Sequence, residues 1–299
     1  MIELKNVSLS FGDIKALDDV SIAIPNGSAY GLLGSNGAGK STILRLLTGI
    51  YKPTEGEVLI DGEAVYNNSK IKERVFFVND ETVQFNKMTV GDMSAYYKRF
   101  YPNFDAELFG RLLDTVKLPR DKRLMNFSKG MKRQAAVICG IACKTPYLFL
   151  DEAFDGLDPT MRNIVKKMLI DAMLDDNLTV IFSSHNLTEM DEFCDRVGLL
   201  HGGKLVFDRE IDEAKGDIVK LQAAFDRSVT AEDFEGIDVL EITQSGSLSV
   251  IIARGNREEI LAAANRLNPR FIDEIPLNLQ EIFIYEMEVL GYDSSNITG

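Results

Sequence analysis

The sequence contains few cysteines and none of the spacings used by thiol-based metal or redox sites. Its three cysteines are Cys139, Cys143 and Cys194, and none of them form a C-x-x-C pattern. Cys139 and Cys143 stand one helical turn apart in an apolar segment, which favours buried, reduced thiols. The cysteine content therefore argues against a metal or redox site.

Long apolar runs are missing as well. No stretch approaches the ~20 apolar residues that a membrane-spanning helix needs. The first residues, Met1 to Lys5, carry neither the basic flank nor the apolar core of a secretion signal. We therefore expect a cytosolic protein whose membrane role would come through a partner.

Basic residues are outnumbered by acidic ones. Lys and Arg total 33 against 46 Asp and Glu, which gives a formal charge of −13. Such a charge repels nucleic acid and anionic lipid in bulk, so we expect no nucleic-acid partner. Any bound polyphosphate must be attracted by local groups.

One segment supplies such local groups. Residues 34–41 read Gly-Ser-Asn-Gly-Ala-Gly-Lys-Ser, the pattern G-x-x-x-x-G-K-[ST]. In this pattern backbone N–H groups surround a phosphate chain, Lys40 reaches the β- and γ-phosphates, and the Ser41 hydroxyl ligates Mg²⁺. A chance glycine-rich turn is the alternative. The apolar strand expected at 29–33 and the helix expected at 42–47 favour a nucleoside-triphosphate site.

A second motif follows a buried strand. Residues 147–150 are apolar and lead directly into Asp151 and Glu152. A strand that ends in this way delivers Asp151 to a Mg²⁺ ion beside the phosphate loop, and Glu152 can act as general base toward the attacking water. Two acids at a strand end are weak evidence alone, but with the phosphate loop they become strong.

The order of predicted elements indicates an α/β fold. Strands are expected at 75–78, 147–150 and 179–183, with a helix at about 160–174 between the last two. This βαβ alternation predicts a parallel sheet. Between residues 88 and 143 the pattern is helical and aromatic, which predicts a helical subdomain (about 82–145) inserted into the core.

The pattern of predicted strands and helices changes near Lys215. Strands are predicted at 218–225, 239–243, 248–253 and 271–275, and helices at 256–267 and 279–290. We therefore expect a domain at 1–215 and a small C-terminal α+β domain at 216–299, with an antiparallel sheet. The second domain contains no motif that we would identify as catalytic.

Taken together, these motifs resemble the ATP-binding subunit of an ABC transporter, which has a P-loop NTPase fold. Residues 126–134 resemble the ABC signature: Ser128 and Gly130 are retained, whereas Lys129 and Met131 replace the usual Gly and Gln. A simple capped helix start is the alternative for this segment. Residues 155–158 resemble the D-loop, in which Asp158 would cross the subunit interface.

Two further residues match the resemblance, and a third departs from it. His185, after the strand at 179–183, resembles the switch histidine that contacts the γ-phosphate; His201 has no such context. Phe11 stands where the family stacks an aromatic ring on adenine, with a core phenylalanine as the alternative. Asp80 stands where the family usually has glutamine, and a slip of one residue would place Asn79 or Glu81 there.

The resemblance implies a full set of site residues. Catalytic roles fall to Glu152, His185, Lys40 and Asp80, and Mg²⁺ contacts to Ser41, Asp151 and Asp80. The ATP contacts would come from Phe11, Gly34, Ser35, Asn36, Gly37, Ala38, Gly39, Lys40, Ser41, Thr42, Ser128, Gly130 and Asp158.

It also implies partners. These are a second ATPase subunit, as a homodimer or a paralogous heterodimer, and an integral membrane permease that holds the protein at the inner face of the cell membrane. The aromatic cluster at 96–101 would contact the permease or pack its own helix. Residues 276–283 resemble a tail motif of drug and antibiotic exporters. One alternative is a soluble nucleotide-dependent regulator, against which stand Glu152 and His185. The other is a non-transport ABC ATPase, against which stand the single motif set and the acidic charge.

Overall fold

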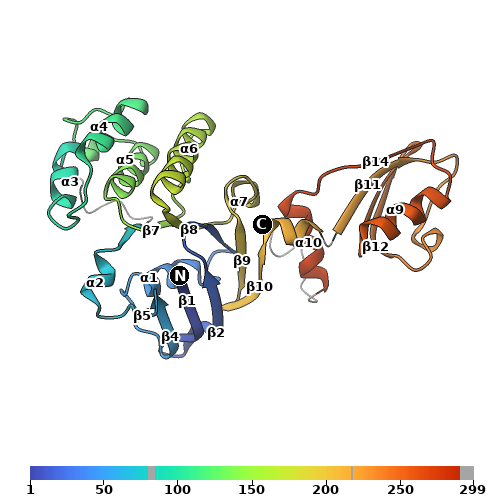
Figure 1. Ribbon diagram of the computed structural model, residues 1–299, viewed down its shortest axis with the longest axis horizontal. Helices are drawn as coiled ribbons and strands as arrows, with labels where there is room; N and C mark the ends of the chain where they lie inside the picture. The colour runs from blue at the N-terminus through green and yellow to red at the C-terminus, as the bar shows by residue number, and fades with distance from the viewer. Residues whose placement is uncertain (80–84, 86, 217, 290–299) are drawn as a thin grey trace. The chain divides into compact units, whose positions relative to one another are not determined.

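The computed structural model describes residues 1–79, 85, 87–216 and 218–289 (Figure 1). The chain forms two compact units. One unit, called here the core unit, comprises Met1–Asn186 and Phe193–Asp208; the other, the C-terminal unit, comprises Leu187–Glu192 and Arg209–Gly299.

The core unit begins with a four-stranded antiparallel sheet in the order β2-β1-β4-β5. Its strands are β1 (Ile2–Phe11), β2 (Ile14–Ile24), β4 (Glu55–Ile60) and β5 (Glu63–Ala64). Along β2 and the end of β4, buried and more exposed residues alternate, so one face of the sheet joins the core.

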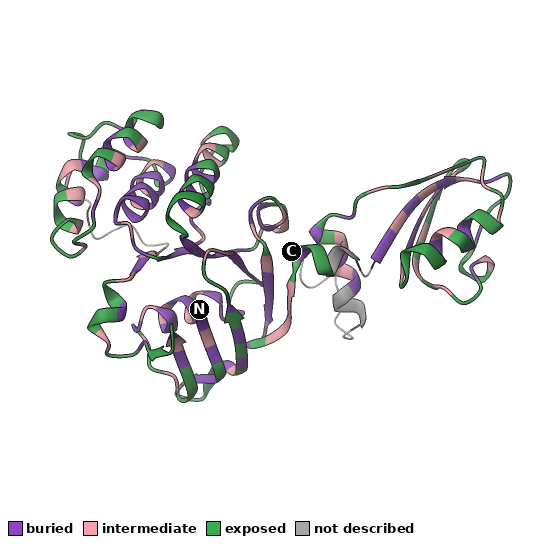
Figure 2. Ribbon diagram, in the orientation of Figure 1, coloured by how far each residue is buried: buried purple, intermediate pink, exposed green. Residues whose placement is uncertain are grey.

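A six-stranded sheet in the order β10-β9-β3-β8-β7-β6 forms the centre of the unit. Its strands are β3 (Ala29–Leu33), β6 (Val75–Val78), β7 (Tyr147–Asp151), β8 (Thr179–Ser184), β9 (Arg196–His201) and β10 (Lys204–Glu210). The pairs β6–β7, β7–β8, β3–β8 and β3–β9 are parallel. Strands β3, β7 and β8 are buried throughout (Figure 2), as their apolar runs require. The parallel α/β core predicted from the sequence is confirmed.

Helices flank this sheet. They are α1 (Lys40–Leu47), α2 (Ser69–Lys72), α3 (Val90–Tyr97), α4 (Ala106–Thr115), α5 (Lys129–Ala142) and α6 (Pro159–Asp176), with a 3₁₀ turn at Leu124–Asn126. Helices α3, α4 and α5 lie between β6 and β7 in sequence, in the stretch whose pattern is helical, and their starts are capped by the side chains of Thr89, Asp105 and Ser128. The predicted start of this insertion, near residue 82, lies outside the described residues.

The C-terminal unit is built on an antiparallel sheet in the order β12-β13-β11-β14, as predicted. Its elements are α7 (Leu187–Phe193, whose last residue is in the core unit), α8 (Ile211–Gly216), β11 (Ile218–Ala224), a 3₁₀ turn at Ala231–Asp233, β12 (Asp238–Ser245), β13 (Leu248–Arg254), α9 (Arg257–Arg266), β14 (Phe271–Glu274) and α10 (Leu279–Val289). Alternate residues of β11 join two hydrophobic clusters: Val219 and Leu221 pack with α9, and Ile218 packs with Ile282 and Tyr285 of α10. Because each sheet face has its own cluster, this unit has a core of its own.

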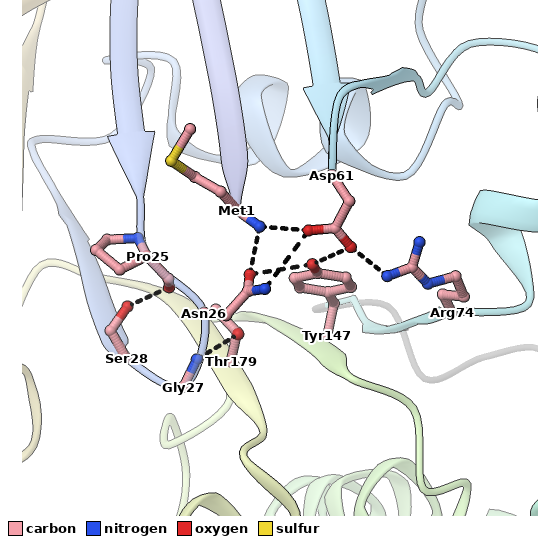
Figure 3. Close-up of polar contacts among 9 residues, drawn as sticks. All are labelled: Met1, Pro25, Asn26, Gly27, Ser28, Asp61, Arg74, Tyr147 and Thr179. Atoms are coloured by element: carbon pink, nitrogen blue, oxygen red, sulfur yellow. Dashed lines mark hydrogen bonds and ion pairs between the residues drawn. The ribbon is translucent and has the colours of Figure 1, made fainter.

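A polar cluster joins the two sheets of the core unit (Figure 3). Asp61, which follows β4, accepts hydrogen bonds from the Met1 amino group, from Tyr147 Oη at 2.7 Å and from Arg74. The Met1 amino group also donates to Asn26, at the end of β2. Burial acts to raise the pKa of Asp61, but these hydrogen bonds outweigh it, so the pKa lies well below its usual range.

This cluster predicts a pH-dependent loss of stability in the variant Asp61→Asn. At pH 7 we expect its free energy of unfolding to fall by about 1 kcal/mol, the usual size for a partly exposed charged hydrogen bond. Because the folded pKa is depressed, the stabilisation is complete above the unfolded pKa of about 3.9 and is lost as pH falls through the folded pKa. Urea unfolding at pH 7 and at pH 3, with Asp121→Asn as an exposed control, measures this. An equal loss at both pH values would refute it.

Candidate nucleotide site

The phosphate loop leaves the carboxyl end of β3 and enters α1. Ser35, Asn36 and Gly37 are exposed at its tip, whereas Ala38, Gly39 and Lys40 are buried. Gly39 caps α1 with a φ of 113° and, having no side chain, makes no capping hydrogen bond to the amides of the first turn. Those amides and the positive end of α1 therefore remain available to an anion.

Gly34 explains why the loop requires glycine. Its φ is 151°, and an added Cβ would lie 2.4 Å from the backbone oxygen of Leu200. Both the backbone conformation and the close approach exclude a side chain. At Gly37 the φ is also positive, at 81°, but an added Cβ would meet no atom within 4 Å. The tip of the loop at Gly37 is thus open to solvent, whereas its base at Gly34 is packed against the backbone of Leu200.

Lys40 lies inside the loop. Its ammonium donates to the backbone oxygens of Gly34 at 2.5 Å and Ser35 at 3.2 Å. Burial lowers the pKa of Lys40, and the nearby carboxylates of Glu152 and Asp151 partly oppose this shift. The structure therefore brings the predicted phosphate-binding cation close to the two acids at the end of β7.

Asp151 is 1% exposed, and its carboxylate accepts hydrogen bonds from two serine hydroxyl groups. Its Oδ1 accepts from Ser41 Oγ at 3.0 Å and from Ser183 Oγ at 2.6 Å. Its Oδ2 is buried and has no hydrogen-bond partner among the described residues. A buried carboxylate oxygen without a partner, next to a serine hydroxyl, suits a hard cation such as Mg²⁺, which takes oxygen ligands. The residues present thus fit the metal that the motif implies.

Glu152 and His185 face each other at the same edge of the sheet. The distance between Glu152 Oε1 and His185 Nδ1 is 3.8 Å. Asp155 joins them, with ligand atoms of all three residues within 4.8 Å of one another. In the sequence Asp155 stands out only as part of the D-loop, because no spacing rule places it beside His185. Ser183 stands in the same motif as the histidine, but no sequence pattern assigns it the hydrogen bond that it donates to Asp151.

The signature residues form a separate group at the start of α5. Ser128 is exposed, and its Oγ accepts from the Met131 amide at 3.1 Å, so the helix start is capped. An added Cβ on Gly130 would lie 2.4 Å from the backbone oxygen of Gly156, so α5 and the D-loop touch closely. Asp158 caps α6 by accepting from the Met161 amide at 3.0 Å.

The remaining predicted residues are less well placed. Phe11 is 46% exposed and meets Tyr51 edge-to-face, with 5.2 Å between ring centroids. A core role for Phe11 is therefore wrong, while its role toward adenine stays a prediction. Thr42 is half-buried in α1. Asp80 and Glu81 lie outside the described residues.

Comparison with known proteins identifies the family. Residues 17–155 match the family model described as ABC transporter. The chain is 30% identical over 285 residues to the ABC transporter ATP-binding protein YtrB of Bacillus subtilis, an alignment covering 95% of this chain and 97% of YtrB. This chain belongs to the ABC transporter ATP-binding proteins.

Other relatives differ in their named direction of transport. The Nod factor export ATP-binding protein I of Sinorhizobium fredii is 30% identical in an alignment that covers 95% of this chain and 84% of the Nod factor protein. The sulfate/thiosulfate import ATP-binding protein CysA of Pseudomonas syringae is 33% identical in an alignment that covers 68% of this chain and 65% of CysA.

Solved structures agree on the fold. A dimeric ATP-binding cassette in a post-hydrolysis state, bound to ADP and Pi, superposes with a TM-score of 0.64 at 23% identity, covering 71% of this chain and 99% of its own. The fold that the motifs predicted is thus confirmed, and membership of the ABC family makes this chain an ATP hydrolase.

The phosphate loop gives a testable prediction for this ABC ATPase. Gly34→Ala should lower the free energy of unfolding by about 2 kcal/mol or more, because it combines backbone strain with a steric clash, and it should abolish ATP binding. Gly202→Ala is the matched control: its φ is 54° and an added Cβ meets nothing within 4 Å. It should cost about 1 kcal/mol and leave binding intact. Circular dichroism during urea unfolding and a fluorescent ATP analogue measure both effects. Equal behaviour of the two variants would contradict the prediction.

Proposed function

We propose that this ATPase powers an exporter, acting as one of two nucleotide-binding subunits attached to a membrane permease. The observation that carries the catalytic part of the proposal is the arrangement around Asp151. Asp151 Oδ1 accepts from Ser41, its Oδ2 has no partner among the described residues, and its carboxylate lies near enough to Lys40 to affect the pKa of that lysine. The general base and the switch histidine lie at the same sheet edge.

Each residue has a distinct task in hydrolysis. Ser41 and Asp151 would hold Mg²⁺, which would supply positive charge to offset the negative charge of the bound phosphates. Lys40 and the amides at the start of α1 stabilise the charge that develops on the transferred phosphoryl group. Glu152 takes a proton from the attacking water, and His185 orients that water and the γ-phosphate.

The exposed signature favours a composite site. Ser128 and the start of α5 would bind an anion at the helix terminus, and within its own subunit Gly130 of this turn lies against Gly156 of the D-loop. In a head-to-tail dimer the signature of one subunit would close over the ATP held by the other. The partner is a second copy or a paralogue, and hydrolysis requires the dimer.

Export is supported by how much of the chain the relatives cover. YtrB and the Nod factor exporter align with 95% of this chain, whereas CysA aligns with 68%. The alignments with the two former proteins therefore extend into the C-terminal unit. Of these two proteins, the Nod factor protein is the one named for export, and its alignment with the C-terminal unit is what favours that direction.

A surface of the helical insertion is suited to the permease. Tyr96 and Phe100 of the aromatic cluster are 38% and 57% exposed, whereas Tyr97 and Tyr101 pack on Phe76. One side of the cluster is therefore packed in the core of the protein, and the other side exposes aromatic surface to which a partner could bind. Within the described part of the chain, no helix is both long and apolar enough to cross a bilayer. Attachment to the inner face of the membrane would thus come through this surface.

The variant Glu152→Gln tests the catalytic assignment. Without the general base, turnover should fall at least about 100-fold, while ATP still binds and holds the dimer together. Light scattering with and without ATP, alongside phosphate release, measures both. Wild-type turnover in the variant would remove Glu152 from this role, and a monomer in ATP would remove the composite site.

The variant Phe100→Glu tests the membrane surface. It should reduce the fraction of the protein in washed membranes of its natural host several-fold, because a charge replaces an aromatic contact. The ATPase rate of the purified protein should not change. Leu174→Glu on α6, where the side chain is 79% exposed, is the control for adding a charge to an exposed apolar position. Equal membrane retention of the two variants would disprove the assignment.

A further inference from the structure

Arg133 is a charged side chain buried inside the core unit. It stands on α5 and is 1% exposed. Burying a guanidinium is costly unless its donors are hydrogen-bonded. Its Nη1 donates to the backbone oxygen of Asp151 at 3.2 Å and to that of Glu152, whereas its Nε has no partner among the described residues. The contacts that compensate its burial are thus with the end of β7.

The backbone of Glu152 is held from two sides. Its φ is 48°, a left-handed conformation that residues other than glycine adopt at a cost. Its N–H donates to Ser183 Oγ at 3.0 Å and to the Ser183 backbone oxygen at 3.2 Å. Its carbonyl accepts from Arg133. The conformation that directs Glu152 toward His185 is therefore fixed by β8 on one side and α5 on the other.

The same helix carries the signature turn. Ser128 caps α5, and Gly130 in its first turn touches the backbone of Gly156. A shift of this turn would therefore reach two points of the β7–α6 connection through one helix, at Gly156 and at Glu152. A well-packed helix moves as a unit, so these points respond together.

We propose that Arg133 is a positioning residue that orients the base Glu152 and links it to the signature turn of its own subunit. This rests on the proposed function, in which the signature turn serves the ATP of the partner and Glu152 serves the ATP of its own subunit. Arg133 then makes the placement of the base at one site depend on the engagement of ATP at the other.

The positioning role is tested with two substitutions. Arg133→Met keeps an unbranched apolar side chain and removes the donors, while Arg133→Lys keeps a charge and a donor. We expect kcat of the Met variant to fall 10- to 100-fold, roughly the effect of misplacing a catalytic group by about 1 Å, with KM for ATP changing less than about threefold. The Lys variant should recover part of the loss. A wild-type kcat in Arg133→Met, or a parallel loss of ATP binding, would overturn the role.

The link to the signature is tested by a double-mutant cycle. If Arg133 transmits the state of the signature turn, Ser128→Ala should reduce kcat by a smaller factor in Arg133→Met than in the wild type. Equal factors in the two backgrounds would overturn the link and leave only local positioning.

A control separates catalysis from folding. Arg196→Met removes another guanidinium of the core unit, whose Nε bonds Asp208 at 2.6 Å near the start of the parallel strands. It should lower the melting temperature without changing kcat of the folded protein. Failure of the proposed function would appear as wild-type turnover in Glu152→Gln. Failure of the present inference would appear as wild-type turnover in Arg133→Met while Glu152→Gln is inactive.

Discussion

The buried carboxylate of Asp151 is the interaction around which the site is arranged. Its Oδ1 binds a hydroxyl from the phosphate loop and another from β8, while the carbonyl of the same residue accepts from α5. Three segments far apart in sequence are thus fixed by one residue at the end of a buried strand. A charge in such a position is tolerated only when its oxygens are satisfied, which is why a cation beside Oδ2 is expected.

The parallel sheet makes this meeting possible. Strand β3 lies between β8 and β9, and β7 lies beside β8. The loops that follow the carboxyl ends of β3, β7 and β8 therefore emerge at one edge, and each contributes a different chemical group. Lys40 comes from the first loop, Glu152 from the second and His185 from the third. The fold supplies proximity, and the loops supply the chemistry.

Local spacing allowed much of this to be predicted. The phosphate loop, the acidic strand end and the parallel strands were readable because each is a short pattern with a direct physical meaning. Asp155, Ser183 and Arg133 were not, since their roles depend on contacts between segments that no spacing rule connects. The polar cluster at Asp61 was missed for the same reason. The exposed Phe11 shows that an aromatic residue in a strand need not be part of the core.

Helix α7 has a consequence for how this protein could exchange parts with its relatives. The residues Leu187–Glu192 are grouped with the C-terminal unit, and Asp191 accepts from the Leu279 amide at 3.4 Å, although both flanking segments of chain belong to the core unit. A recombination point at residue 208 would leave this helix behind with the wrong neighbours. A chimaera that takes α7 and residues 209–299 from the same parent would preserve the hydrogen bond between Asp191 and Leu279. The C-terminal unit can therefore be exchanged intact only together with a segment that precedes β9.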